Sequence, residues 1–256
     1  MSQTVETTKR NGEIDFFRFI FCMMIIIMHY GYYCTAGKRV FFIGAPIGVE
    51  FFFLVCGWLM AAHIHKLSGN EKPGKATAEY LTNRLKSILP YTTIGVVLAF
   101  ITASAGTGTG AFTLFKRGLV AVLEILLLPE LGVGFDTYVP VLWYVSSMLF
   151  AILILYPIFV WNKDIYLNVL APIFMIVYLG WIFQTDGLLN GHGSWHTIAT
   201  NGTFRAIGEI SAGCICFNLS KKISQSVNGK FSRIALSAAN IIGYITVIVM
   251  AFFNSG

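Results

Sequence analysis

The sequence has few charged residues for its length. Only 12% of its 256 residues are Asp, Glu, Lys or Arg, whereas soluble domains average about 25%. So few charges cannot cover a globular surface in water, but a surface that faces lipid does not need them. The chain is also 56% hydrophobic and rich in Phe and Gly, which suits transmembrane helices. The composition therefore predicts an integral membrane protein.

Several functional motifs are also missing. The sequence contains no Gly-x-Ser-x-Gly elbow, no Walker loop and no dinucleotide fingerprint. Its five cysteines follow neither a zinc spacing nor a disulfide framework. His192 and His196 have a metal-like spacing, but Asp186 is the only further ligand type nearby. We therefore predict no metal site.

Long apolar segments dominate what is present. A transmembrane helix needs about 20 mostly apolar residues, and eight segments approach this requirement. They are Ile14–Tyr33, Ala45–Ala62, Ile88–Ala105, Gly118–Leu128, Val139–Trp161, Ile165–Phe183, Phe204–Leu219 and Ile234–Phe253. We predict an all-α, polytopic transmembrane helix bundle with seven or eight spans, forming one membrane-embedded domain over residues 1–256.

The basic residues predict the topology. The connection His63–Leu89 is the most basic, and the positive-inside rule places it, and hence the N-terminus, in the cytoplasm. The net charge of +6 is explained by topology control, so we expect no nucleic-acid partner. Eight spans would put the basic cluster around Lys221 and Arg233 outside. Seven spans, with Gly118–Leu128 interfacial or re-entrant, would return it to the cytoplasm.

The first apolar segment carries ionisable residues, which are costly in a membrane and often functional. Arg18 and His29 are eleven positions apart, so on a helix they lie about 20° apart around the axis and about 16 Å apart along it. Asp15 falls on the same stripe. Arg18 alone would suit snorkelling with Asp15 as its partner, and His29 alone a structural histidine. Their shared face favours a polar cavity inside the bundle.

Other acidic residues fall within apolar segments. Glu50 lies in the second segment, where it could orient His29, because consecutive helices pack side by side. The alternative is an acid at the membrane interface. Glu124, and the i,i+4 pair of Arg205 and Glu209, have the pattern of structural pairs or cavity liners rather than catalysts.

Four landmarks in chain order resemble the acyltransferase-3 family of membrane acyltransferases. The first is Glu13-Ile-Asp-Phe-Phe-Arg-Phe, with Arg18 opening an Arg-x10-His signature that ends at His29. The second is Gly48-Val-Glu-Phe-Phe-Phe-Leu-Val-Cys-Gly-Trp-Leu-Met. The third is Asn83-Arg-Leu-Lys-Ser-Ile-Leu-Pro-Tyr, and the fourth is Leu142-Trp-Tyr-Val-Ser. Together they extend over more than half of the chain.

The resemblance implies transfer of an acyl group, often acetyl, from cytoplasmic acyl-coenzyme A to a hydroxyl of a carbohydrate or lipid-linked glycan. His29 would be the general base, and Arg18 would bind a phosphate or a charge on the carbonyl side. Glu50 or Asp15 would hold the tautomer of His29 or balance its charge. Arg84 and Lys86 would hold the phosphates of coenzyme A. The implied location is the cell membrane, in contact with its lipid.

The sequence departs from the family pattern in two places. The basic loop of the family carries Arg-x-x-Arg, and here Ser87 occupies the second position. The family also has about ten helices, so we expect the domain to be incomplete at its C-terminus. These departures leave two alternatives open, a non-catalytic membrane subunit of the same fold and a small-molecule or proton-coupled transporter.

Overall fold

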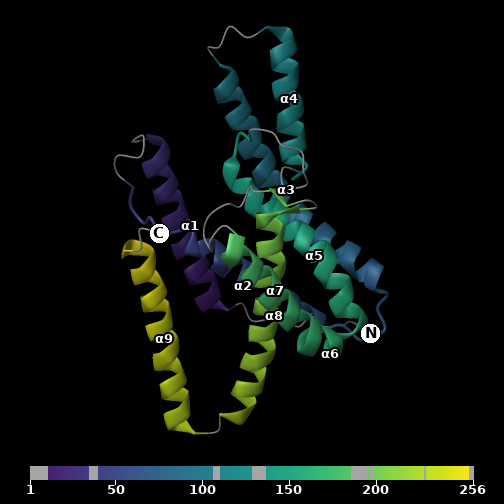
Figure 1. Ribbon diagram of the computed structural model, residues 1–256, viewed down its shortest axis with the longest axis vertical. Coiled ribbons are helices and arrows are strands. Elements are labelled where there is room, and N and C mark those ends of the chain that lie inside the picture. The colour runs from purple at the N-terminus through teal and green to yellow at the C-terminus, as the bar shows by residue number, and fades with distance from the viewer. Residues whose placement is uncertain are drawn as a thin grey trace, which may run out of the picture. The chain divides into compact units, whose positions relative to one another are not determined.

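The computed structural model describes residues 11–34, 40–105, 110–128, 137–185, 195–196, 199–227 and 229–253. Almost all of them are helical (Figure 1). The long helices are α1 (Gly12–Cys34), α2 (Ile47–Ile64), α3 (Pro73–Ser104), α4 (Ala111–Ile125), α5 (Trp143–Trp161), α7 (Ala171–Thr185), α8 (Asn201–Ser226) and α9 (Lys230–Phe253). The predicted all-α fold class is confirmed.

Short elements connect some of these helices. A 3-10 turn, η2 (Pro140–Leu142), precedes α5, and α6 (Lys163–Ile165) with the π-helix η3 (Tyr166–Leu170) leads into α7. Two-residue strands, β1 (Trp195–His196) and β2 (Ala199–Thr200), pair in antiparallel register just before α8.

Six helical segments in the described part of the chain are long and apolar enough to cross a membrane. They are Gly12–Cys34, Ile47–Ile64, Pro73–Ser104, Pro140–Trp161, Lys163–Thr185 and Ser232–Met250. The predicted segments Gly118–Leu128 and Phe204–Leu219 also fall largely on helices, α4 and α8. However, α4 has only 15 residues, or about 22 Å, and α8 is long but carries charged residues along its length.

The third predicted segment begins much earlier than its hydropathy indicates. We expected the basic connection to extend to Leu89 and the third span to begin at Ile88, but α3 already begins at Pro73 and continues through Pro90. Proline is well suited to the first turn of a helix, because the missing N–H would have no partner there. Arg84 and Lys86 therefore lie on a helix rather than in a loop, which corrects that expectation.

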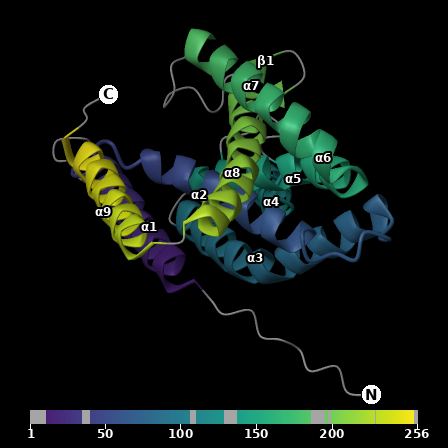
Figure 2. The same cartoon turned by 90° about the horizontal axis from the view of Figure 1, so that it is seen from below.

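The chain divides into two compact units, residues 1–55 with 227–256 and residues 56–226. In the first unit, Phe21, Met24 and Met28 of α1 form a buried cluster with Ala45. The helices α1 and α9 lie side by side (Figure 2), with the rings of Phe17 and Tyr244 stacked at 3.5 Å.

In the second unit, α8 packs against α7 and α5, and α3 packs against α5 and α4. Aromatic side chains fill the interior near the C-terminal end of α5, where the rings of Phe159 and Tyr166 stack at 4.4 Å and both are fully buried. Gly57 of α2 contacts the backbone of α8 directly, and the Cys214 thiol donates a hydrogen bond to the Gly57 carbonyl oxygen at 3.3 Å.

Candidate functional site

The residues of the Arg-x10-His signature lie on one uninterrupted helix. Because α1 runs from Gly12 to Cys34 without a break, Arg18 and His29 share the predicted stripe. The Arg18 guanidinium lies 3.8 Å from the Asp15 carboxylate, and its side chain is 46% exposed. Asp15 is thus the ion-pair partner that the sequence predicts for Arg18.

His29 lies beside the buried face of α1, not within it. The buried residues are Phe21, Met24, Met28 and Gly31, and the centre of that face is about 100° from the Arg18–His29 stripe. The His29 ring is half-buried and stacks against Tyr33 at 6.0 Å. Within the first unit, the stripe is therefore open on one side.

Glu50 belongs to the first turn of α2 and to the same unit as His29. It is half-buried. Among the residues that the structure describes, no hydrogen bond joins Glu50 to His29, so its orienting role stays a prediction.

Arg84 is held by an aromatic residue of its own helix. Its Nη2 donates a hydrogen bond to the Tyr80 hydroxyl at 3.0 Å, and the guanidinium carbon lies 5.4 Å from the centre of the Tyr80 ring. Lys86, two positions further, projects about 200° around the helix and is exposed. Arg84 and Lys86 thus occupy different faces of α3.

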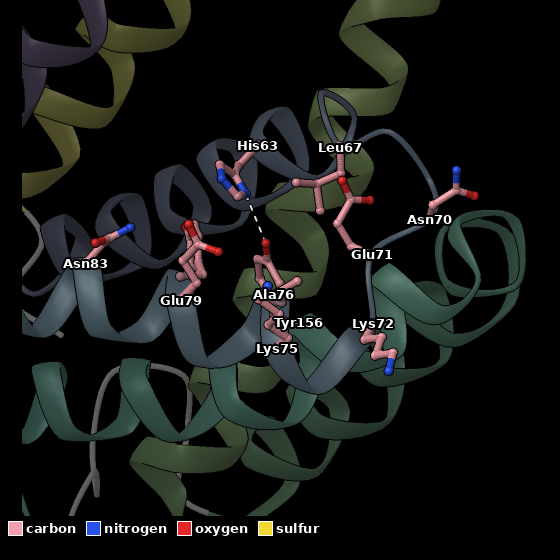
Figure 3. A pocket seen from close by; sticks show the side chains of 11 residues that line it. His63, Leu67, Asn70, Glu71, Lys72, Lys75, Ala76, Glu79, Asn83 and Tyr156 are labelled. Atoms are coloured by element: carbon pink, nitrogen blue, oxygen red, sulfur yellow. Dashed lines mark hydrogen bonds between the residues drawn. The ribbon is translucent and has the colours of Figure 1, made fainter.

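A cavity of about 570 Å³ lies between the end of α2 and the start of α3 (Figure 3). Its walls belong to the predicted basic connection, with Tyr156 added from α5. The lining residues are His63, Leu67, Asn70, Glu71, Lys72, Lys75, Ala76, Glu79, Tyr80, Asn83 and Tyr156. The cavity is therefore polar, carries both signs of charge, and includes two lysines.

One wall of this cavity consists of linked aromatic rings. His63 Nδ1 and the Tyr156 hydroxyl are 3.0 Å apart, and the dashed line in Figure 3 marks this hydrogen bond. Tyr156 stacks on Tyr80 at 4.6 Å, and His63 lies 5.0 Å from Tyr80. Sequence reasoning missed all three residues, because His63 and Tyr156 are 93 positions apart and no short motif connects them.

The carboxylate of Glu71, which lines the cavity, stabilises the turn at Ser68 and Gly69. Glu71 accepts hydrogen bonds from the Ser68 hydroxyl at 2.6 Å, the Ser68 N–H at 3.1 Å and the Gly69 N–H at 3.0 Å. Gly69 has φ of 89°, a conformation that favours glycine. The hydrogen bond from the Ser68 side chain is the main reason why the pKa of Glu71 is lowered. Glu71 therefore stabilises this turn through hydrogen bonds to its charged carboxylate.

Glu124 has a structural role, as one of the two readings of the sequence proposed. Its carboxylate is 1% exposed and accepts hydrogen bonds from the N–H groups of Tyr138 and Val139, at 2.9 and 2.6 Å. These contacts secure the segment that enters η2 and α5. The fourth sequence landmark, which begins at Leu142, follows immediately.

The predicted pair of Arg205 and Glu209 is present and buried. Arg205 Nε donates to Glu209 Oε1 at 2.9 Å, with side-chain exposures of 6% and 7%. The guanidinium also lies 5.9 Å from the centre of the Trp143 ring, so the pair joins α8 to the start of α5.

The histidines with metal-like spacing fall largely outside the described residues. This is the case for His192 and Asp186, and only the backbone of His196 is described. Within the described ranges, no group of three or more His, Cys, Asp or Glu side chains is placed to hold a metal ion.

These observations define a polytopic helical membrane protein with ionisable residues on its first helix and a polar cavity between its second and third. The family model of the acyltransferase domain known as acyltransferase-3 matches residues 11–255, nearly the whole chain. The protein belongs to this family, as the four landmarks predicted. No curated protein and no solved structure matches the chain.

Proposed function

We propose that the protein transfers an acyl group, acetyl in the simplest case, from acyl-coenzyme A to a hydroxyl of a carbohydrate or lipid-linked glycan. The observation that carries this proposal is the continuous helix α1, which puts Arg18 and His29 on one stripe in a chain of an acyltransferase family. An imidazole on a membrane helix is the group best suited to activate a hydroxyl near neutral pH.

The proposed chemistry follows from the nature of the two groups. A neutral His29 takes the proton of the acceptor hydroxyl while the hydroxyl oxygen attacks the thioester carbonyl carbon. The carbon–sulfur bond then breaks. His29 returns the proton to the departing thiolate, so coenzyme A leaves as the free thiol. Arg18 lies about 16 Å from His29 along the helix axis, so it binds a phosphate of the donor rather than the reacting carbonyl group, and Glu50 orients the imidazole.

Arg84 supports the donor side of the proposal. Among the described residues it has no carboxylate within ion-pair distance, and its one described hydrogen bond goes to a neutral phenol. Its positive charge is therefore available for a phosphate of acyl-coenzyme A. Lys72 and Lys75 in the cavity lining, and Lys86 on the outer face of α3, would add to the attraction. A cytoplasmic N-terminus in the plasma membrane would place these residues on the side where acyl-coenzyme A is made.

The test compares three proteins, each purified as the full chain in lipid nanodiscs. Wild type, His29→Ala and His65→Ala receive radiolabelled acetyl-coenzyme A and a mixed pool of glycan acceptors. His65 is a matched control, because its Nδ1 forms a hydrogen bond of 2.9 Å with the carbonyl of Ala61, four residues earlier in the chain. We expect His29→Ala to lose about 100-fold or more in turnover, and His65→Ala to keep most of it.

Two outcomes would contradict the proposal. Binding of coenzyme A without turnover by wild type would favour the non-catalytic membrane subunit. Absence of both binding and turnover would remove acyl-coenzyme A as the donor, and substrate movement in proteoliposomes would then identify a transporter.

A further inference from the structure

We propose that Tyr80 is a positioning residue for Arg84, and that Tyr156 and His63 hold Tyr80 in place. This inference rests on the proposed function in one respect, because it takes Arg84 as the group that binds a phosphate of the donor. The residues form an unbroken series of contacts from the cavity wall, where Figure 3 shows His63 and Tyr156, to the Arg84 guanidinium.

An arginine side chain has many rotamers, so a guanidinium with no fixed contact loses entropy when it binds an anion. A carboxylate partner would fix it but would also neutralise it. The Tyr80 hydroxyl fixes the guanidinium at 3.0 Å and leaves its positive charge uncompensated. A phenol is therefore the better partner for an arginine that has to bind a phosphate.

Tyr80 is itself held in place by its neighbours. The residue is 9% exposed, and its ring is covered on one side by Tyr156, with an interplanar angle of 25°. Tyr156 is fully buried, and its hydroxyl is held by His63 Nδ1. That hydrogen bond survives either protonation state of His63, because a hydroxyl can both donate and accept. The phenol that contacts Arg84 is thus itself immobilised.

His63, Tyr80 and Tyr156 all line the cavity, whereas Arg84 does not. Tyr80 is therefore the residue through which the cavity lining and Arg84 meet. Ordinary packing of aromatic rings would explain the stacking, but it would not require the Tyr80 hydroxyl.

The experiment removes that hydroxyl and keeps the ring. Wild type, Tyr80→Phe and Tyr91→Phe are prepared as full chains in nanodiscs, and the affinity for coenzyme A and the steady-state constants are measured. Tyr91 is a matched control, because it lies on the same helix and is 79% exposed. We expect Tyr80→Phe to weaken binding and to raise the KM for acetyl-coenzyme A about tenfold, with kcat within about twofold of wild type. Tyr91→Phe should match wild type.

A double-mutant cycle separates positioning from general damage to the fold. In the Arg84→Ala background, Tyr80→Phe should have no further effect on binding, because the residue that it positions is gone. Equal losses in both backgrounds would overturn the inference, and so would a Tyr80→Phe variant that binds and turns over like wild type.

A second readout does not depend on coenzyme A. Phenylglyoxal modifies accessible guanidinium groups, and peptide mass spectrometry follows the rate at Arg84. The rate should rise in Tyr80→Phe and in Tyr156→Phe, but not in Tyr91→Phe. If this rise occurs while wild type fails to bind coenzyme A, the proposed donor is wrong and the positioning role stands. An unchanged rate would overturn the positioning role, even if wild type proves to be an active acyltransferase.

Discussion

Gly57 allows α2 and α8 to approach until their backbones touch. A Cβ atom built on Gly57 would lie 2.0 Å from the carbonyl oxygen of Ile210 and 3.1 Å from the amide nitrogen of Cys214. Both contacts are with helix backbone, which cannot rotate out of the way as a side chain can. Gly57→Ala therefore has to push the two helices apart by about 1 Å or more.

The cost of Gly57→Ala can be worked from these contacts. Overpacking of a tight interface costs about 1–3 kcal/mol, and loss of the hydrogen bond from Cys214 to Gly57 adds up to about 1 kcal/mol. We therefore expect a loss of about 1–4 kcal/mol in the free energy of unfolding. For a chain of this size that corresponds to a fall in Tm of about 2–16 °C.

The assay is thermal unfolding in detergent, followed by the amount of monodisperse protein that survives heating. Gly95→Ala is the matched control, because a Cβ at Gly95 meets nothing within 4 Å and alanine favours the helix. Its Tm should stay the same or rise slightly. A Gly57→Ala protein that melts with wild type would refute the reasoning, since it would mean that α2 and α8 are not in backbone contact.

Three further predictions concern the other polar contacts. Glu124→Ala leaves two backbone N–H groups without an acceptor and should lower the free energy of unfolding by about 2–4 kcal/mol in a denaturation titration. Glu124→Gln, which keeps an acceptor, should lower it by less. Arg205→Leu should cost about 3–5 kcal/mol, because it leaves Glu209 buried alone, and adding Glu209→Leu should restore part of that loss. The pKa of Glu71 is lowered in the folded state. Its hydrogen bonds to the Ser68–Gly69 turn therefore stabilise the fold fully above the usual glutamate pKa of about 4.3. This stabilisation is lost as the pH falls through the lowered pKa of the folded state. The protection factor of the Gly69 amide, which is its intrinsic exchange rate divided by the observed rate, should fall on acidification in wild type and should be low at every pH in Glu71→Gln.

The landmarks that identify the family prove to have structural reasons within this chain. The second glycine of the second landmark, Gly57, lies at the contact of α2 with α8. In the fourth landmark, Leu142 is buried and Trp143 lies under the Arg205 guanidinium. These residues were recognisable from the sequence as a pattern, but their partners on α8 were not, because those partners lie far along the chain.

Part of the candidate site followed from the sequence, because helical geometry depends only on spacing. Arg18 and His29 share a stripe for that reason. The pairing of Arg205 with Glu209 could be predicted in the same way, from i,i+4 spacing. The catalytic role of His29, and the donor roles of Arg84 and Lys86, stay predictions that the experiments above test.

The amino-acid sequence by itself determined that this is a helical membrane protein of the acyltransferase-3 family. Scarcity of charge, long apolar segments and ordered landmarks are properties of the chain read in one dimension, and lipid as a solvent leaves helices as the simplest way to satisfy the backbone. Only the tertiary structure decided which side chains build the cavity. They meet because α3 packs against α5, and because His63, at the end of α2, contacts both Tyr80 and Tyr156. Such packing depends on the fit of whole helix surfaces, which no local spacing encodes.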